Sequence, residues 1–194
     1  MKHLARIPVI PLALIVAAAG SLVISCTSDG KDGSSTERVT QLPQPEDVLS
    51  PELLLPLRQA QNLHHIADVQ LQNGKLGEAT EAVRRILSLR FPAGAPEGED
   101  VILDARARLA RMLVTQGKLA EALQVVDEGI KSASRDSFFL SNVNTARGEV
   151  LEALAVTLDD TDKAAADKHR EDAIRARMRS IAIDNALLDQ LEGK

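Results

Sequence analysis

Two stretches of this 194-residue chain repeat one another, and this internal repeat limits what the chain can fold into. Residues 66–87 read IADVQLQNGKLGEATEAVRRIL, and residues 109–130 read LARMLVTQGKLAEALQVVDEGI. In both stretches apolar residues recur three and four positions apart on either side of a glycine break. This is the pattern of two amphipathic helices joined by a tight turn. The chain is therefore expected to contain helical hairpins built on one plan.

The amino-acid composition favours helices and argues against strands. Trp and Tyr are absent, and the three phenylalanines are the only aromatic residues. Strands favour β-branched and aromatic side chains, whereas Ala and Leu, which dominate the apolar residues here, favour helices. The sequence therefore predicts an all-α fold. A third and less regular helix pair is expected over residues 138–158 and 163–183, with a short capping turn over 186–191.

Capping residues mark where several of these helices start and stop. Ser50 followed by a proline is typical of a helix N-cap with proline in the first turn. Gly74 and Gly117 are typical of helix C-termini that lead into a tight turn. The second helix is expected to end at the Phe-Pro pair of residues 91–92, with residues 93–100 forming a loop to the next pair.

Small residues recur at matching places in the repeated units. They are Ala67 and Ala110 in the first helices, Ala79 and Ala122 in the second helices, and Gly74 and Gly117 in the turns. Residue 66 corresponds to residue 109, so the unit repeats after 43 residues. The pattern resembles the tetratricopeptide repeat (TPR), a helix-turn-helix unit of about 34 residues, with residues 93–100 as the excess. The resemblance covers about residues 57–184 and implies about three antiparallel helix pairs stacked as a short α-solenoid. It also implies that Gly148 and Ala173 hold the small-residue positions of the third pair. The usual aromatic residues of the first helix are missing, and the third pair has no turn glycine.

The N-terminus is typical of an exported bacterial lipoprotein. Lys2 and Arg6 precede an uncharged apolar run, which closes on Val-Ile-Ser followed by Cys26, the only cysteine of the chain. This pattern resembles a lipoprotein signal and implies that Cys26 becomes the acylated, membrane-anchored first residue of the mature chain. An uncleaved anchor helix remains an alternative, because about 20 apolar residues can span a bilayer. A cytoplasmic protein with an apolar N-terminus is the other alternative.

These observations predict three parts of the chain. Residues 1–25 form the signal peptide, and residues 26–46, rich in Ser, Gly and Pro with little to bury, form a flexible tether. Residues 47–194 form the TPR-like helical domain. By resemblance to Gram-negative lipoproteins, the absence of Asp at position 27, after the lipidated cysteine, favours the outer membrane over the inner membrane. The domain is then expected to be anchored in the cell envelope by its lipid and to face the periplasm.

A longer segment carries a resemblance to one particular group of anchored helical proteins. Residues 108–128 read RLARMLVTQGKLAEALQVVDE, and residues 146–154 read ARGEVLEAL. They resemble the membrane-anchored TPR-like family that includes the ancillary subunit of the Sec translocon, and by layout the chain also resembles the pilotin class of TPR lipoproteins. The resemblance implies a lipid-anchored scaffold that binds envelope or secreted proteins and assists secretion or assembly. The alternative is a structural envelope lipoprotein that associates with itself as a homo-oligomer and has no dedicated peptide ligand.

The resemblance also implies where a partner peptide or helix would bind. Stacked helix pairs curve, and the first helix of each pair lines the concave side. The family's groove positions fall on Gln61, His64, Asp68 and Leu71 in the first pair, on Asp104, Ala107, Arg111 and Val114 in the second, and on Asn142, Thr145 and Glu149 in the third. A plain solvated surface is the alternative reading of these residues.

The remaining features argue against other classes of function. The net charge of −5, which becomes −7 without Lys2 and Arg6, disfavours nucleic acid as a partner. His64 and its neighbour His65 point about 100° apart on a helix, so they are not expected to bind one metal ion together. The acidic run 159–162 lacks the spaced oxygens of a calcium loop and is expected to cap the next helix.

No catalytic or phosphate-binding motif occurs, so we expect neither an enzyme nor a cofactor. The arginine clusters are expected to pair with nearby carboxylates.

Overall fold

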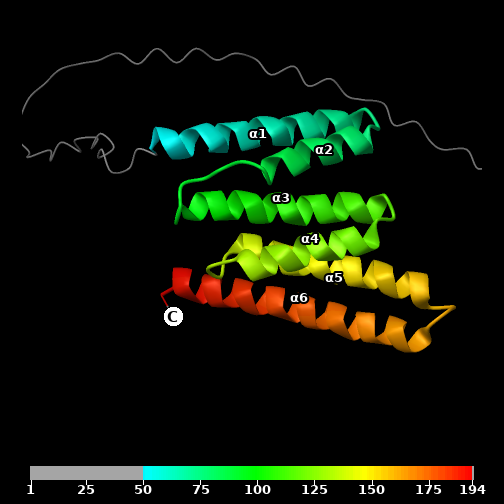
Figure 1. Cartoon of the computed structure of the whole chain (residues 1–194). Coiled ribbons are helices and arrows are strands. Elements are labelled where there is room, and N and C mark those ends of the chain that lie inside the picture. Colours follow the sequence, from blue (N-terminus) through cyan, green and yellow to red (C-terminus); the bar gives the residue numbers. More distant parts are fainter. Residues whose placement is uncertain (1–49, 194) are drawn as a thin grey trace, which may run out of the picture. The chain divides into compact units, whose positions relative to one another are not determined.

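The computed structural model describes residues 50–193, so the predicted signal peptide, Cys26 and the tether lie outside the described residues. The described residues form six helices and no strand, which confirms the all-α prediction. Consecutive helices run antiparallel, as Figure 1 shows. The helices are α1 (Pro51–Gln72), α2 (Leu76–Ile86), α3 (Pro96–Thr115), α4 (Leu119–Ser132), α5 (Phe138–Leu158) and α6 (Lys163–Leu191).

The helices pack as three consecutive hairpins. Helix α1 packs on α2, α3 on α4, and α5 on α6. Helix α3 also contacts α1, α2 and α5, and α4 contacts α5, so each hairpin lies against the next. The first helices of the hairpins are thereby neighbours, which places side chains of α1, α3 and α5 on a common surface.

Small buried residues let these helices approach one another closely. Ala67, Ala79, Ala110 and Ala122 are all fully buried, at the places where the repeat pattern has small residues. Larger side chains such as Val83, Ile86, Leu103, Leu109 and Leu113 fill the space between them in one continuous hydrophobic cluster. Burying apolar side chains of this size contributes about 1.5–3 kcal/mol each relative to exposing them. The alternation of small and large residues therefore fixes how closely the helices cross.

The predicted helix caps are confirmed. The Ser50 side chain accepts a hydrogen bond from the backbone N–H of Leu53 at the start of α1, and the Asp162 side chain accepts one from Ala165 at the start of α6. Gly74 and Gly117 follow α1 and α3, each with φ of +72°. Each takes part in the paired bonds of a helix C-terminus, in which the glycine N–H and the next N–H return to carbonyls of the last turn.

Replacing Gly117 by alanine is expected to destabilise the fold by about 1 kcal/mol, because a Cβ atom is strained at a positive φ. Gly117→Asn should cost less, since asparagine tolerates this conformation better than alanine does. Urea unfolding of both variants, followed by far-UV circular dichroism, measures the difference. Equal stabilities for Gly117→Ala and the unmodified chain would contradict the turn geometry.

Three helix boundaries differ from the sequence prediction. Helix α2 ends at Ile86, five residues before the Phe-Pro pair, and α3 begins at Pro96, inside the stretch 93–100 that was expected to be a loop. The acidic residues Glu97 and Glu99 occupy the first turn of α3, where they favour a helix start. Helix α6 continues through residues 184–191, so the expected separate capping turn is part of this helix.

Most arginines of the clusters pair with carboxylates, as predicted, and several arginine pairs connect neighbouring helices. Arg147 of α5 pairs with Asp127 of α4 at 2.7 Å, and Arg177 of α6 pairs with Glu152 of α5 at 2.6 Å. Pairs at the surface are each worth about 0–1 kcal/mol, so they orient the hairpins more than they stabilise them.

Candidate functional site

The surface shared by α1 and α3 carries two adjoining hollows. The first, of about 360 Å³, is lined by Gln61, His64 and Asp68 of α1 and by Asp104 of α3, with apolar walls from both helices and from Phe139 of α5. The second, of about 430 Å³, continues along α1 and α3 as far as the first residue of α2. Its lining residues are Leu71, Leu76, Asp104, Arg108, Arg111, Met112 and Thr115. Asp104 belongs to both hollows, and we call the two together the α1–α3 groove.

A charged network crosses the first hollow. The Arg108 guanidinium donates a 3.1 Å hydrogen bond to Nδ1 of His64 and also pairs with Asp68. Because an arginine always donates, Nδ1 of His64 accepts and the ring proton of the neutral imidazole sits on Nε2. That nitrogen lies 3.6 Å from a carboxylate oxygen of Asp104. Carboxylates, an imidazole and a guanidinium therefore lie next to one another in the wall of the groove.

The surroundings of His64 favour its neutral form. Burial of the ring lowers the pKa of His64 below its ordinary value of 6.5, and the nearby Arg108 charge lowers it further. The carboxylates of Asp104 and Asp68 oppose this shift and raise the pKa, but burial is the largest effect. The imidazole is thus held uncharged as a hydrogen-bond acceptor for Arg108.

Acidification is expected to destabilise the fold through His64. Because the pKa is lower in the folded protein, the unfolded chain takes up the proton first as the pH falls below 6.5, and stability is lost there. Above pH 6.5 the contribution of His64 to the free energy of unfolding is fully present. His64→Gln should remove this part of the pH dependence, whereas His65→Gln, which changes an exposed neighbour, should keep it. Urea midpoints between pH 7.5 and 5 test this; identical slopes for the two variants would contradict it.

Three other predicted groove residues meet where α3 faces α5. The Arg111 guanidinium donates hydrogen bonds of 2.8 Å to Glu149 and 2.9 Å to Asn142. This fork links the second hairpin to the third. Most N–H donors of Arg111 are bonded within the chain. Arg111 therefore helps to shape the groove and offers little free hydrogen-bonding capacity to a partner.

The remaining predicted groove residues lie elsewhere. Ala107 is fully buried, and Val114 packs against the hydrophobic core. The Thr145 hydroxyl lies 2.9 Å from that of Ser180 on α6, so it joins the contact between α5 and α6. Conversely, Arg108 was not predicted, although it stands four residues after Asp104 on the same face of α3.

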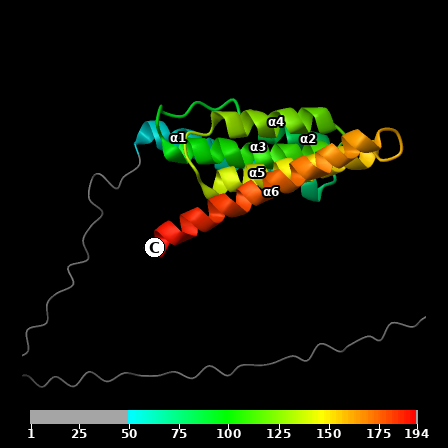
Figure 2. The same ribbon diagram turned by 90° about the horizontal axis from the view of Figure 1, so that it is seen from below.

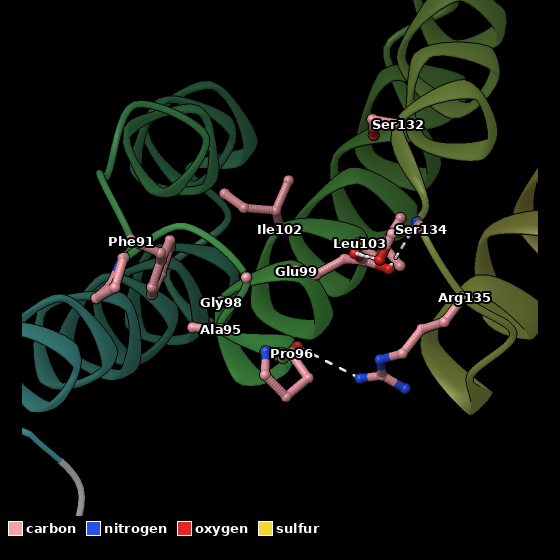
Figure 3. Close-up of a pocket in the computed structure, with 12 residues that line it drawn as sticks. Phe91, Ala95, Pro96, Gly98, Glu99, Ile102, Leu103, Ser132, Ser134 and Arg135 are labelled. Carbon is pink, nitrogen blue, oxygen red and sulfur yellow. Dashed lines mark hydrogen bonds between the residues drawn. The ribbon is translucent and has the colours of Figure 1, made fainter.

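A third hollow, of about 520 Å³, lies at the end of the body where α3 begins and was not predicted (Figure 3). Phe91, Ile102 and Leu103 supply much of its apolar wall. Its polar rim is bonded internally, since Glu99 accepts a 3.1 Å hydrogen bond from the backbone of Ser134 and Arg135 donates to the carbonyl of Pro96. The hollow therefore offers a ligand mainly apolar surface.

The described residues contain neither a cluster of metal ligands nor a helix suited to a bilayer. Between residues 50 and 193 no three His, Asp or Glu side chains come together in an arrangement that could hold a metal ion. Within the same range, every helix is too short or too polar to cross a membrane.

Comparison with known proteins leaves the chain without an assigned family. No protein-family model, no curated protein and no solved structure matches it. The resemblance to the tetratricopeptide repeat thus rests on the residues quoted above and stays a prediction.

Proposed function

We propose that this chain is a lipid-anchored scaffold of TPR-like repeats that binds envelope or secreted proteins outside the cytoplasm and has no catalytic role. The observation that carries the proposal is the α1–α3 groove, in which six residues expected from the TPR resemblance line adjoining hollows. These residues are Gln61, His64, Asp68, Leu71, Asp104 and Arg111.

The arrangement of the helices supports a short α-solenoid. Each of the first two hairpins has a fully buried alanine in both helices and a glycine turn between them, so both are built alike. The third hairpin keeps small buried residues, Gly148 and Ala173, at the corresponding helix crossing. Each hairpin leaves one side to be covered by the next, which is the way in which repeat proteins build an elongated binding surface.

The chemistry of the groove suits a segment with apolar anchors and a basic residue. Leu57, Val101 and Phe139 provide apolar contact around the first hollow. Asp104 lies in the middle of the groove and makes no hydrogen bond within 3.5 Å to another described side chain, so it can accept one from a partner. Because the groove lacks Trp and Tyr, which usually carry most binding energy, we expect modest affinity strengthened by a shared membrane surface.

Site-specific photocrosslinking in cells tests the groove. A photoreactive amino acid at Gln61, which lines the first hollow, should give discrete adducts with exported or envelope proteins. The same amino acid at Gln59 is a matched control, since Gln59 is an exposed glutamine on α1 outside the groove. Equal labelling from both positions, or none from either, would count against the groove as the binding site.

The anchor is tested separately. Cys26→Ser is expected to abolish lipid incorporation and to release the chain from membranes if the signal peptide is otherwise processed. Metabolic labelling with palmitate and membrane fractionation, including separation of inner and outer membranes, measure both effects. A Cys26→Ser chain that still incorporates palmitate and stays in the outer membrane would contradict the lipoprotein assignment but would leave the groove proposal intact.

A further inference from the structure

The outer face of α6 carries a row of exposed apolar residues. Among the described helices α6 packs only on α5, through small residues and Ile183 on its inner face. On the other face Ile174 is 63% exposed, Met178 61%, Ile181 52% and Leu188 47%. Figure 2 shows the C-terminal turns of α6 projecting past the other helices. Soluble proteins seldom leave such a continuous apolar row in water, so it marks an interaction surface.

The spacing of this row is that of a coiled-coil seam. Positions 174, 178, 181, 185 and 188 alternate steps of four and three, which is the a/d pattern of a heptad repeat. Asn185, at an a position, is the polar member, and the other four members are apolar. We call Ile174, Met178, Ile181, Asn185 and Leu188 the α6 seam.

The charges beside the seam distinguish between parallel and antiparallel pairing. Arg175 and Asp189 lie along one flank, at e positions, and Arg177 and Asp184 lie along the other, at g positions. Both flanks thus change from basic to acidic along the helix. In an antiparallel pair e faces e and g faces g, so the arginines of one helix meet the aspartates of the other. In a parallel pair a g residue faces the e residue five positions further on, which would set Asp184 against Asp189 and Arg170 against Arg175.

The aspartates are available for this pairing. Neither Asp184 nor Asp189 forms an ion pair with another residue between 50 and 193. The arginines are held in place by carboxylates of their own chain, Arg175 by Asp172 and Arg177 by Glu152. Antiparallel packing also sets opposite helix dipoles side by side.

We propose that a second copy of this chain covers the α6 seam, so that two α6 helices pack antiparallel in a two-fold dimer. Met178 of one copy then lies against Ile181 of the other at the centre, and Ile174 lies against Asn185. The same surface is used by both copies, as two-fold symmetry requires. The seam lies on α6, whereas α1 and α3 form most of the groove, so the inference does not depend on the proposed function.

Disulfide trapping tests the pairing and its direction. The full chain is used in detergent, with Cys26→Ser as the background so that the introduced thiol is the only one. Tagged Ile174→Cys is mixed with untagged Asn185→Cys and oxidised. An antiparallel pair brings these two positions together, while each position lies about 16 Å along the axis from its own copy. The expected product is the mixed dimer, with little dimer from either variant alone.

A matched pair on α1 controls for non-specific association. Leu55→Cys and Ile66→Cys replace exposed apolar residues with the same eleven-residue spacing and should not form a mixed dimer. Same-site dimers at 174 and at 185 would overturn the antiparallel arrangement. A mixed α1 product as abundant as the α6 product, or no product at all, would overturn the α6 seam as the interface. Residues 55, 66, 174 and 185 are all exposed, and circular dichroism checks that the variants fold.

Charge reversal gives an independent measurement. Asp184→Arg combined with Asp189→Arg makes both flanks basic throughout and is expected to raise the dimer dissociation constant at least about tenfold in sedimentation experiments. Glu78→Arg combined with Glu81→Arg makes the same change of net charge on exposed residues of α2. This control should leave the dimer dissociation constant unchanged. Equal effects of the two double variants would overturn the proposed contact.

Discussion

Shortening Leu113 to alanine is expected to destabilise the helical body by about 3–5 kcal/mol, the largest effect that we expect of a single side chain. Leu113 is fully buried in α3, and α3 contacts α1, α2, α4 and α5. The substitution removes the transfer free energy of the deleted atoms and leaves a cavity that rigid neighbouring helices fill only in part. Since a domain is stable by only about 5–15 kcal/mol, this loss is a large share of the total free energy of unfolding.

Leu55→Ala is the matched control, because Leu55 is 63% exposed on α1. Its cost should stay within about 0.5 kcal/mol. Far-UV circular dichroism is the suitable probe, since the chain has neither Trp nor Tyr. The urea midpoint of Leu113→Ala should fall with an unchanged slope. Similar midpoints for the two variants would show that α3 is not at the centre of the packing.

The helices that could be predicted from the sequence are those whose signals are local. Helix periodicity, the Ser50 and Asp162 caps, and the glycines after α1 and α3 each act within one or two turns, and all were predicted. Such signals require no knowledge of what the helix packs against. For that reason both hairpin turns and both ends of α5 were predicted correctly.

The connection between the first two hairpins could not be predicted in the same way. Residues 93–100 were expected to form a loop. Gly98 lies instead in the first turn of α3, where a Cβ atom would come within 2.5 Å of the Phe91 side chain. Only glycine leaves room here for the side chain of Phe91, which lies seven residues earlier in the chain, on the other side of a bend. A pattern of neighbouring residues in the sequence does not indicate a contact of this kind.

The groove shows the same division. The TPR resemblance predicted Gln61, His64, Asp68 and Asp104 for one groove, and the four residues line the same hollow. The resemblance did not indicate that Arg108 of α3 would donate a hydrogen bond to His64 of α1. Nor did it indicate that Thr145 of α5 would form a hydrogen bond with Ser180 of α6. Those contacts depend on how far apart the helices lie and on their crossing angles, which the packing of the whole body sets.

Gly98→Ala is expected to destabilise the protein by about 1–3 kcal/mol, although alanine is the better helix former. The new methyl group would meet both Cβ and Cγ of Phe91, so the segment between α2 and α3 must shift and the wall of the third hollow must open (Figure 3). The same substitution at Gly77 provides the control. Gly77 lies in α2, and no atom lies within 4 Å of the place that a methyl group would take there, so Gly77→Ala should stabilise by about 0.5–1 kcal/mol.

A double-mutant cycle identifies the cause of the Gly98→Ala effect. Phe91→Gly removes the Cβ atom that the new methyl group meets, and by itself it costs stability through the lost apolar contact. If that contact is the reason for Gly98, the combined variant will be more stable than the sum of the two single effects predicts, by about 1 kcal/mol or more. Strict additivity, measured from urea midpoints, would mean that Phe91 does not explain the glycine. A stabilised Gly98→Ala would mean that α3 begins later than Pro96, because a glycine ahead of the helix would not meet Phe91 in this way.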